Sequence, residues 1–99
     1  MIIDVTGDGA TDAIVCGEGD HIGAIEATTW DGASVTLQES VSGSSFVDSD
    51  DPYNTGNALT RTENGKAFRL TGGCQYRVNV SSYGGSTAGL RLVVNRAGK

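Results

Sequence analysis

Apolar and polar side chains alternate along several short stretches of the chain. Over residues 74–81, apolar Tyr76, Val78 and Val80 alternate with polar neighbours. A period of two residues places one set of side chains on each face of a strand. The same pattern predicts further strands at residues 34–40, 66–70 and 88–96. Each of these strands therefore has one face for the core and one face for solvent.

The stretch from Ser34 to Asp48 is predicted as the central element, made of a strand, a tight turn and a second strand. Val35 and Leu37 lie on one face of the first strand. Gly43 suits a turn position that needs a positive φ angle. We expect Phe46, from the second strand, to join the core.

Two dipeptides mark further turns, Asp31-Gly32 and Asn64-Gly65. Both pairs are typical of tight hairpin turns, because Asn, Asp and Gly tolerate positive φ angles. Asn64-Gly65 is therefore expected to join a strand at residues 57–62 to its partner at residues 66–70.

Two weaker strands are expected at residues 12–16 and 21–29. The second carries Ile22, Ala24 or Ile25, and Ala27, and the surrounding glycines and threonines favour a bulged strand over a short helix. About eight short strands without a helical period predict an all-β fold. A chain of 99 residues is typical of one domain, so we expect a single small antiparallel β-sandwich.

The first residues are predicted to form an arm. Residues 1–11 divide into a β-prone start and a Gly-rich hinge, and residues 12–99 form the sandwich. Ile2 and Ile3 are adjacent, so they point to opposite faces of a strand, and a terminal strand in a monomer buries only one of them. We therefore expect Ile2 and Ile3 to contact a neighbouring subunit or another protein surface.

The composition limits the classes of partner that the chain is expected to bind. The net charge is −5, from 12 acidic and seven basic residues, and the basic residues are scattered. A nucleic-acid surface needs clustered Lys and Arg, so no nucleic-acid partner is expected. No apolar run approaches the roughly 20 residues of a membrane span, and the first residues lack the features of a signal peptide. We expect synthesis in a cytoplasm and no membrane partner.

Residues 4–12 resemble the start of a calcium loop, with acidic residues at intervals and a glycine for the bend. Thr6 replaces the usual Asp or Asn, and Val15 stands where the bidentate Glu belongs. A solvated acidic turn is therefore favoured over a calcium site, and no metal is predicted.

The sequence predicts no catalytic residue and no cofactor. Asp48, Asp50 and Asp51 lie in a polar loop with Pro52, where the burial that paired catalytic carboxylates need is not expected. His21 is the only histidine, and no nucleophile motif of the G-x-S-x-G type accompanies it. A hydrolase that uses the acidic loops is therefore the least favoured function class, and the chain is expected not to be an enzyme.

The two cysteines, Cys16 and Cys74, lie far apart and outside any Cys-x-x-Cys pair. Together with one histidine they cannot supply the four ligands of a structural zinc site. Two small buried thiols are the favoured interpretation in a reducing compartment, and a disulfide is the alternative.

Three aromatic residues are candidates for contacts with a partner. Trp30 stands at a turn, and Tyr53 and Tyr83 stand in loops. Aromatic side chains are enriched in protein interfaces. They also cover the open ends of sandwiches, and for Trp30 both interpretations stay open.

Five segments carry a resemblance to a known family. They are Val35-Thr36-Leu37-Gln38-Glu39-Ser40, Ser42-Gly43-Ser44-Ser45-Phe46-Val47-Asp48, Asn64-Gly65, Phe68-Arg69-Leu70 and Gly73-Cys74-Gln75-Tyr76-Arg77-Val78. Their order and spacing, over the middle and later two-thirds of the chain, resemble the head decoration (cement) proteins of tailed bacteriophages. The resemblance implies a jelly-roll-like subunit, often a homotrimer, on the outer surface of the virion. There it would clamp neighbouring major capsid proteins and stabilise the capsid.

The expected function is therefore that of a structural, capsid-stabilising protein. The alternative is a carbohydrate-binding or adhesive module of a phage tail or fibre. That alternative needs an exposed aromatic platform, such as Trp30 together with Tyr53 or Tyr83.

Overall fold

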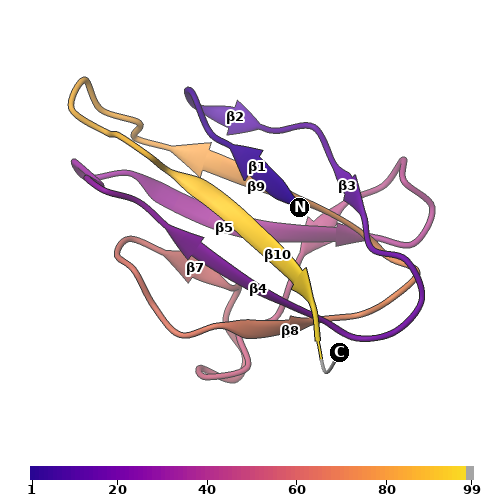
Figure 1. The fold of residues 1–99 in the computed structure, drawn as a ribbon. Helices are drawn as coiled ribbons and strands as arrows, with labels where there is room; N and C mark the ends of the chain where they lie inside the picture. Colours follow the sequence, from indigo (N-terminus) through magenta and orange to yellow (C-terminus); the bar gives the residue numbers. More distant parts are fainter. Residues whose placement is uncertain (98–99) are drawn as a thin grey trace.

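The computed structural model describes residues 1–97, which fold into strands joined by turns and loops (Figure 1). The strands are β1 (Ile2–Asp4), β2 (Gly9–Ala10), β3 (Ile14–Val15), β4 (His21–Glu26), β5 (Ser34–Ser40), β6 (Val47–Asp48), β7 (Thr60–Arg61), β8 (Phe68–Leu70), β9 (Gln75–Ser81) and β10 (Arg91–Arg96). Within residues 1–97 there is no helix long and apolar enough to cross a membrane.

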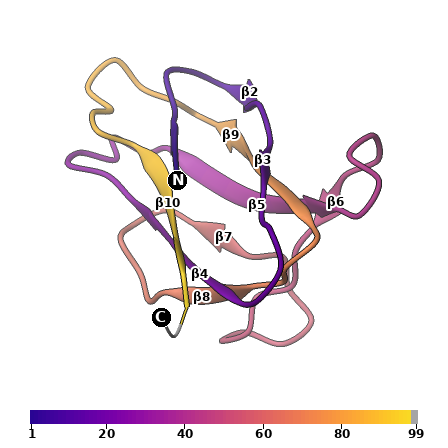
Figure 2. The ribbon, with the colours of Figure 1, turned by 45° about the vertical axis from the view of Figure 1, so that its right-hand side comes forward.

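The strands form two antiparallel sheets that pack face to face (Figure 2). The four-stranded sheet has the order β1-β10-β4-β8. In the six-stranded sheet β5 and β9 are the central strands; β2 and β3 both pair with β9, and β6 and β7 both pair with β5. In Figure 1 the four-stranded sheet, with β10 in yellow, lies in front of the six-stranded sheet.

The strand order is that of a jelly roll. β2 and β3 follow one another along β9, and β6 and β7 follow one another along β5, so the ten strands occupy eight positions. Numbered along the chain, these positions give the orders 1-8-3-6 and 2-7-4-5 in the two sheets. This arrangement of two Greek keys is the jelly roll. The predicted all-β, jelly-roll-like sandwich is confirmed.

The core lies between the sheets and follows the predicted alternation. From the six-stranded sheet, Val78 is fully buried with Leu37 beside it on β5, and from the other sheet Leu92 and Val94 are fully buried. The buried apolar residues are Ile3, Val5, Cys16, Ile25, Ala33, Val35, Leu37, Leu59, Phe68, Leu70, Tyr76, Val78, Val80, Leu90, Leu92 and Val94. The inward faces predicted for β5, β8, β9 and β10 are therefore confirmed.

The core prediction for Phe46 was wrong, and the structure decides the inward face of β4, which the sequence left open. Ile22 faces outward and is 40% exposed, because His21, Gly23 and Ile25 take the buried positions of β4. A Cβ atom at Gly23 would lie 3.0 Å from the Phe68 ring, so the glycine makes room for that ring. Phe46 is half-buried outside the core, and its ring lies 4.1 Å below the guanidinium of Arg77.

Asn64-Gly65 is not a hairpin turn. β7 pairs with β5 in one sheet and β8 pairs with β4 in the other, so the chain crosses between the sheets at this point. The amide oxygen of Asn64 instead accepts hydrogen bonds from the Ala27 backbone N–H and the Trp30 indole N–H, both at 2.9 Å. Asp31-Gly32 does form a tight turn with positive φ angles, but it too joins strands of different sheets.

Residues 50–58 form a loop that interrupts one strand position. The Ser49 backbone N–H bonds the Leu37 oxygen, and the Leu37 N–H bonds the Leu59 oxygen, so β6 and β7 continue one another along β5. The Leu59 N–H donates to Ser49 across the base of the loop at 2.8 Å. The chain therefore leaves the edge of the sheet after Ser49 and returns to the same edge at Leu59.

Residues 1–11, the predicted arm and hinge, hydrogen-bond to both sheets within the single chain. β1 pairs with β10, and the Thr11 N–H donates to the Val78 oxygen on β9. Ile3 and Val5 belong to the core, whereas Ile2 faces outward and is 53% exposed. A strand at this edge thus buries one of the two adjacent isoleucines and leaves the other for solvent or a partner.

Val78→Asp is expected to unfold the protein. Val78 is fully buried, and an unpaired carboxylate at such a position costs more than about 3 kcal/mol, a large part of the total stability of a small domain. Circular dichroism melting of the variant should show no cooperative transition at the wild-type temperature. The matched control is Asn79→Asp, at the next, exposed position of β9, which should keep the wild-type transition. A folded Val78→Asp variant would show that the inward face of β9 is misassigned.

Asn64→Ala is expected to lower stability by about 1–2 kcal/mol, because it removes the acceptor of two hydrogen bonds at once. The Trp30 indole then loses its partner, so its fluorescence should move to longer wavelength as the ring gains contact with water. Urea unfolding followed by fluorescence measures both effects. Asn57→Ala, at an exposed position of the 50–58 loop, is the control, and equal losses in the two variants would contradict the assigned role of Asn64.

Candidate contact surface

The outer face of the four-stranded sheet carries a row of apolar side chains. The register aligns Ile2 on β1 with Val93 on β10, and Val93 with Ala24 on β4. Ile22 follows on the same face of β4, two residues before Ala24. Ile2 and Ile22 are exposed, and Val93 and Ala24 are half-buried by their neighbours. We call these four residues the apolar patch.

Charged residues flank the apolar patch on two sides. On one side of the patch, the next pair of outward-facing residues is Arg91 on β10 and Glu26 on β4. Their side chains form an ion pair at 2.6 Å, and each is about two-fifths exposed. In the other direction, Arg69 lies beside Ile22 and pairs with Asp20 at 3.4 Å in a largely exposed ion pair. The patch therefore has an apolar centre and a rim of both signs of charge, as many protein interfaces have.

A hollow of about 390 Å³ continues the apolar patch beyond β8. Its lining consists of Ile22, Pro52, Tyr53, Ala67, Phe68 and Arg69. Tyr53 is 56% exposed and comes from the 50–58 loop, whereas Ile22 comes from the sheet face. The loop thus extends the contact surface past the edge of the sheet.

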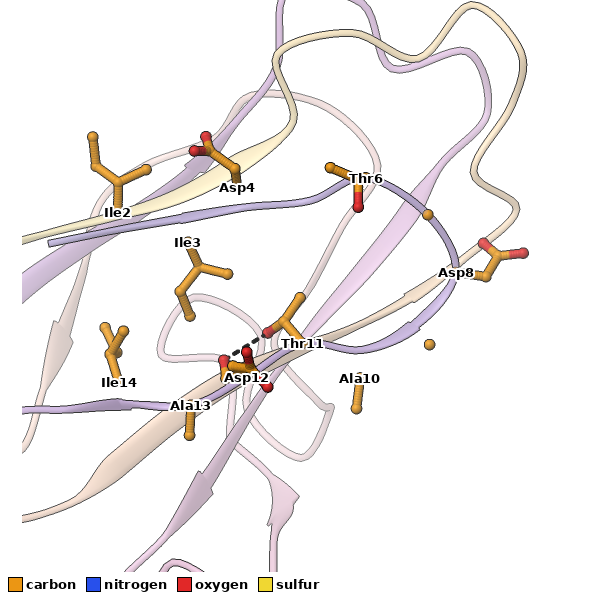
Figure 3. A pocket seen from close by; sticks show the side chains of 12 residues that line it. Ile2, Ile3, Asp4, Thr6, Asp8, Ala10, Thr11, Asp12, Ala13 and Ile14 are labelled. Atoms are coloured by element: carbon orange, nitrogen blue, oxygen red, sulfur yellow. Dashed lines mark hydrogen bonds between the residues drawn. The ribbon is translucent and has the colours of Figure 1, made fainter.

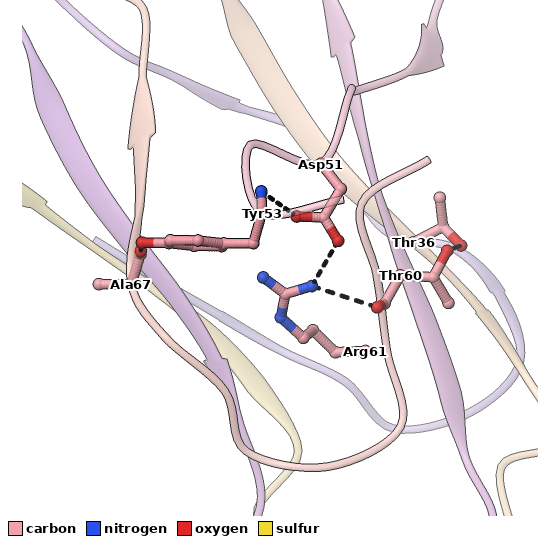
Figure 4. Close-up of polar contacts among 6 residues, drawn as sticks. All are labelled: Thr36, Asp51, Tyr53, Thr60, Arg61 and Ala67. Atoms are coloured by element: carbon pink, nitrogen blue, oxygen red, sulfur yellow. Dashed lines mark hydrogen bonds and ion pairs between the residues drawn. The ribbon is translucent and has the colours of Figure 1, made fainter. Parts of the chain in front are cut away.

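The Tyr53 ring is held in place at both ends (Figure 4). Its hydroxyl donates to the Ala67 oxygen at 2.6 Å, and its backbone N–H donates to the Asp51 carboxylate at 2.9 Å. Asp51 in turn pairs with Arg61 at 3.2 Å, and both side chains are nearly buried. The Lys66 ammonium lies 5.2 Å from the ring centroid, a cation–π distance. An exposed aromatic side chain that is fixed in this way loses little conformational freedom when a partner binds.

Trp30 and Tyr83 lie together at one end of the sandwich. Both pack against the core and are half-buried. The Tyr83 hydroxyl donates to the Thr87 oxygen at 3.4 Å, and the Thr87 hydroxyl donates to the Trp30 oxygen at 2.9 Å. With the Trp30 indole N–H bonded to Asn64, these aromatics cover the end of their own sandwich. Tyr53 belongs to a different element, so the structure does not join the three residues into one platform.

A second hollow, of about 490 Å³, separates β1 from β2 and β3 (Figure 3). Ile3 points into the space between these strands, while Asp8 sits at the bend that follows the arm. The Asp8 carboxylate accepts the Tyr83 backbone N–H at 2.8 Å and so fixes the bend to the β9–β10 loop. Within residues 1–97, no three His, Cys, Asp or Glu side chains come together as a metal site.

The structure places the five predicted contact residues in four different settings. Ile2 lies in the apolar patch and Tyr53 at the adjoining hollow, Ile3 is buried, and Trp30 and Tyr83 close one end. Sequence reasoning missed Ile22 as a contact residue, because it left the inward face of that strand open. It also missed the contribution of Val93, although an apolar residue on the outward face of a cleanly alternating strand was the available signal.

Comparison of the chain with protein-family models, with curated proteins and with solved structures found no match. The resemblance to phage decoration proteins therefore stays a prediction from the sequence.

Proposed function

We propose that the protein is a structural binding protein that attaches to a folded protein lattice through the apolar patch. Following the sequence resemblance, the lattice is the outer surface of a phage capsid and the direct partner is the major capsid protein. The observation that carries the proposal is the row formed by Ile2, Val93 and Ala24, which three paired strands place side by side on an outward face.

The apolar patch suits a preformed contact. Its side chains stand on hydrogen-bonded strands, so a partner meets them already ordered. Full burial of an isoleucine contributes roughly 1.5–3 kcal/mol, and Ile2 and Ile22 still have about half of that surface to lose. One patch therefore supports a weak contact, and the charged rim of Arg69, Asp20, Arg91 and Glu26 supports a defined orientation.

A repeating lattice turns such weak contacts into stable attachment. Copies that are linked to one another bind adjacent lattice sites with a high effective concentration, and their affinities multiply. The expected homotrimer would present three patches in this way. The net charge of −5 supports a protein partner over nucleic acid, because the chain as a whole repels phosphate.

A second candidate function is that of a carbohydrate-binding module of a phage tail or fibre, and the fixed, exposed ring of Tyr53 favours it. A fixed aromatic ring beside a hollow can stack on the apolar face of a sugar, and Arg69 lies in the same lining as a hydrogen-bond donor. Tyr53→Ala distinguishes the two candidates. It should abolish a glycan signal on an array of bacterial surface glycans, but it should leave most of the lattice binding through the apolar patch.

Ile22→Asp is expected to reduce lattice binding about tenfold or more, because a carboxylate then faces the apolar partner surface. Co-sedimentation with capsid shells assembled from the major capsid protein of the same genome measures the loss. Sedimentation velocity of the free protein shows whether the same face also joins copies of this chain.

Val41→Asp is the matched control. Val41 is 84% exposed and follows β5 in the other sheet, so the same change of side chain there should leave binding intact. Unchanged capsid occupancy for Ile22→Asp, with a wild-type melting temperature, would show that the apolar patch is not the contact surface.

A further inference from the structure

Cys16 and Cys74 face each other across the edge of the six-stranded sheet. β3 and β9 pair Ile14 with Tyr76 and Val15 with Gln75, so the next step of the register places Cys16 opposite Cys74. The Cys16 backbone N–H donates to the Cys74 oxygen at 3.0 Å, which extends the ladder to this pair. Directly opposed residues of antiparallel strands have Cα atoms about 4.5–5.5 Å apart, inside the range of about 4.4–6.8 Å that a disulfide needs.

A glycine bulge brings the two residues into this position. Gly73 has a φ of +87° and is the third residue of a turn closed by the Cys74 N–H and the Thr71 oxygen at 3.4 Å. The Gly73 N–H donates to the Cys16 oxygen at 2.8 Å, so Gly73 and Cys74 both oppose Cys16. The Tyr76 hydroxyl accepts the Thr71 N–H at 2.8 Å and fixes the turn from inside.

The two thiols share the core side of the sheet but differ in access to solvent. Cys16 is fully buried, and Cys74 is half-buried and packs against the core. Val15, the residue before Cys16 and the last residue of β3, is exposed, which agrees with the inward position of Cys16. Burial raises the pKa of the Cys16 thiol and the nearby Cys74 raises it further, while the Met1 ammonium lowers it.

We propose that Cys16 and Cys74 are a redox pair, which a small external disulfide converts into an intramolecular disulfide. Both thiols are free in this structure. The Cys74 thiolate attacks one sulfur of oxidised glutathione, expels one glutathione thiolate and becomes a mixed disulfide. Cys16 then loses its proton to solvent, attacks the Cys74 sulfur and expels the second glutathione thiolate. Two electrons pass from the cysteine pair to glutathione, which leaves as two reduced molecules.

The order of attack follows from exposure and proton affinity. Cys74 can meet the oxidant, whereas Cys16 is covered by the core and has a raised pKa. The second step therefore waits for Cys16 to lose its proton and should become faster as the pH rises. The disulfide would close a loop between two residues that lie 58 positions apart in the sequence. It would also link β3, a strand of two residues, covalently to β9.

The test uses the folded full chain and oxidised glutathione. Mass spectrometry of the intact protein should show loss of both free thiols without lasting glutathione addition, and non-reducing peptide mapping should recover a Cys16–Cys74 peptide. The oxidised protein should melt several degrees higher than the reduced protein, and dithiothreitol should reverse the shift.

Single variants separate the two steps. Cys16→Ser should stop at a glutathione adduct on Cys74, and Cys74→Ser should stay unmodified while folded, because its remaining thiol is covered. The proposal does not depend on the proposed function. It is overturned if the wild-type chain keeps a stable adduct on Cys74, or if its cysteines bond only between chains or only in denaturant.

Discussion

The seven-residue ladder between β5 and β9 is the interaction on which the rest of the structure depends. These are the longest strands, and they pair along their whole length from Ser34–Ser81 to Ser40–Gln75. Every other strand of the six-stranded sheet is bonded to one of them. Their inward residues, among them Leu37 and Val78, form the floor on which the second sheet packs. Loss of this ladder would divide that sheet into two fragments, one with β2 and β3 on β9 and one with β6 and β7 on β5.

The sequence alone was sufficient where a strand alternates cleanly. In β9 the inward positions of Tyr76, Val78 and Val80 followed from the period of two. It failed in β4, where His21 and Gly23 take buried positions and the apolar Ile22 does not. The reason is local packing, because the Phe68 ring occupies the space above Gly23. A period of two cannot reveal which set is inward when both sets contain apolar and polar residues.

Turn chemistry identified where the chain bends but not which sheet it enters next. Asn64-Gly65 has the composition of a hairpin turn, yet the flanking strands belong to different sheets. In this jelly roll β5 and β6 form a hairpin within one sheet, whereas β7 and β8 belong to different sheets, so a local turn signal is compatible with both outcomes. The candidate contact surface depends on the same long-range order. Ile2, Val93 and Ala24 are far apart along the chain, and only the register of β1, β10 and β4 unites them.

The interrupted strand positions restrict how copies of this protein can associate. A long unpaired strand at the border of a sheet invites the backbone of another molecule, and repetition of that event produces fibres. Here one border of the six-stranded sheet is broken by the 50–58 loop, and the other is split between β2 and β3. At the β8 border of the four-stranded sheet, the Tyr53 hydroxyl already donates a hydrogen bond to the Ala67 carbonyl, which precedes β8. Assembly is thereby directed away from open-ended strand addition and toward side-chain contacts between faces, a geometry in which an assembly of defined size can close.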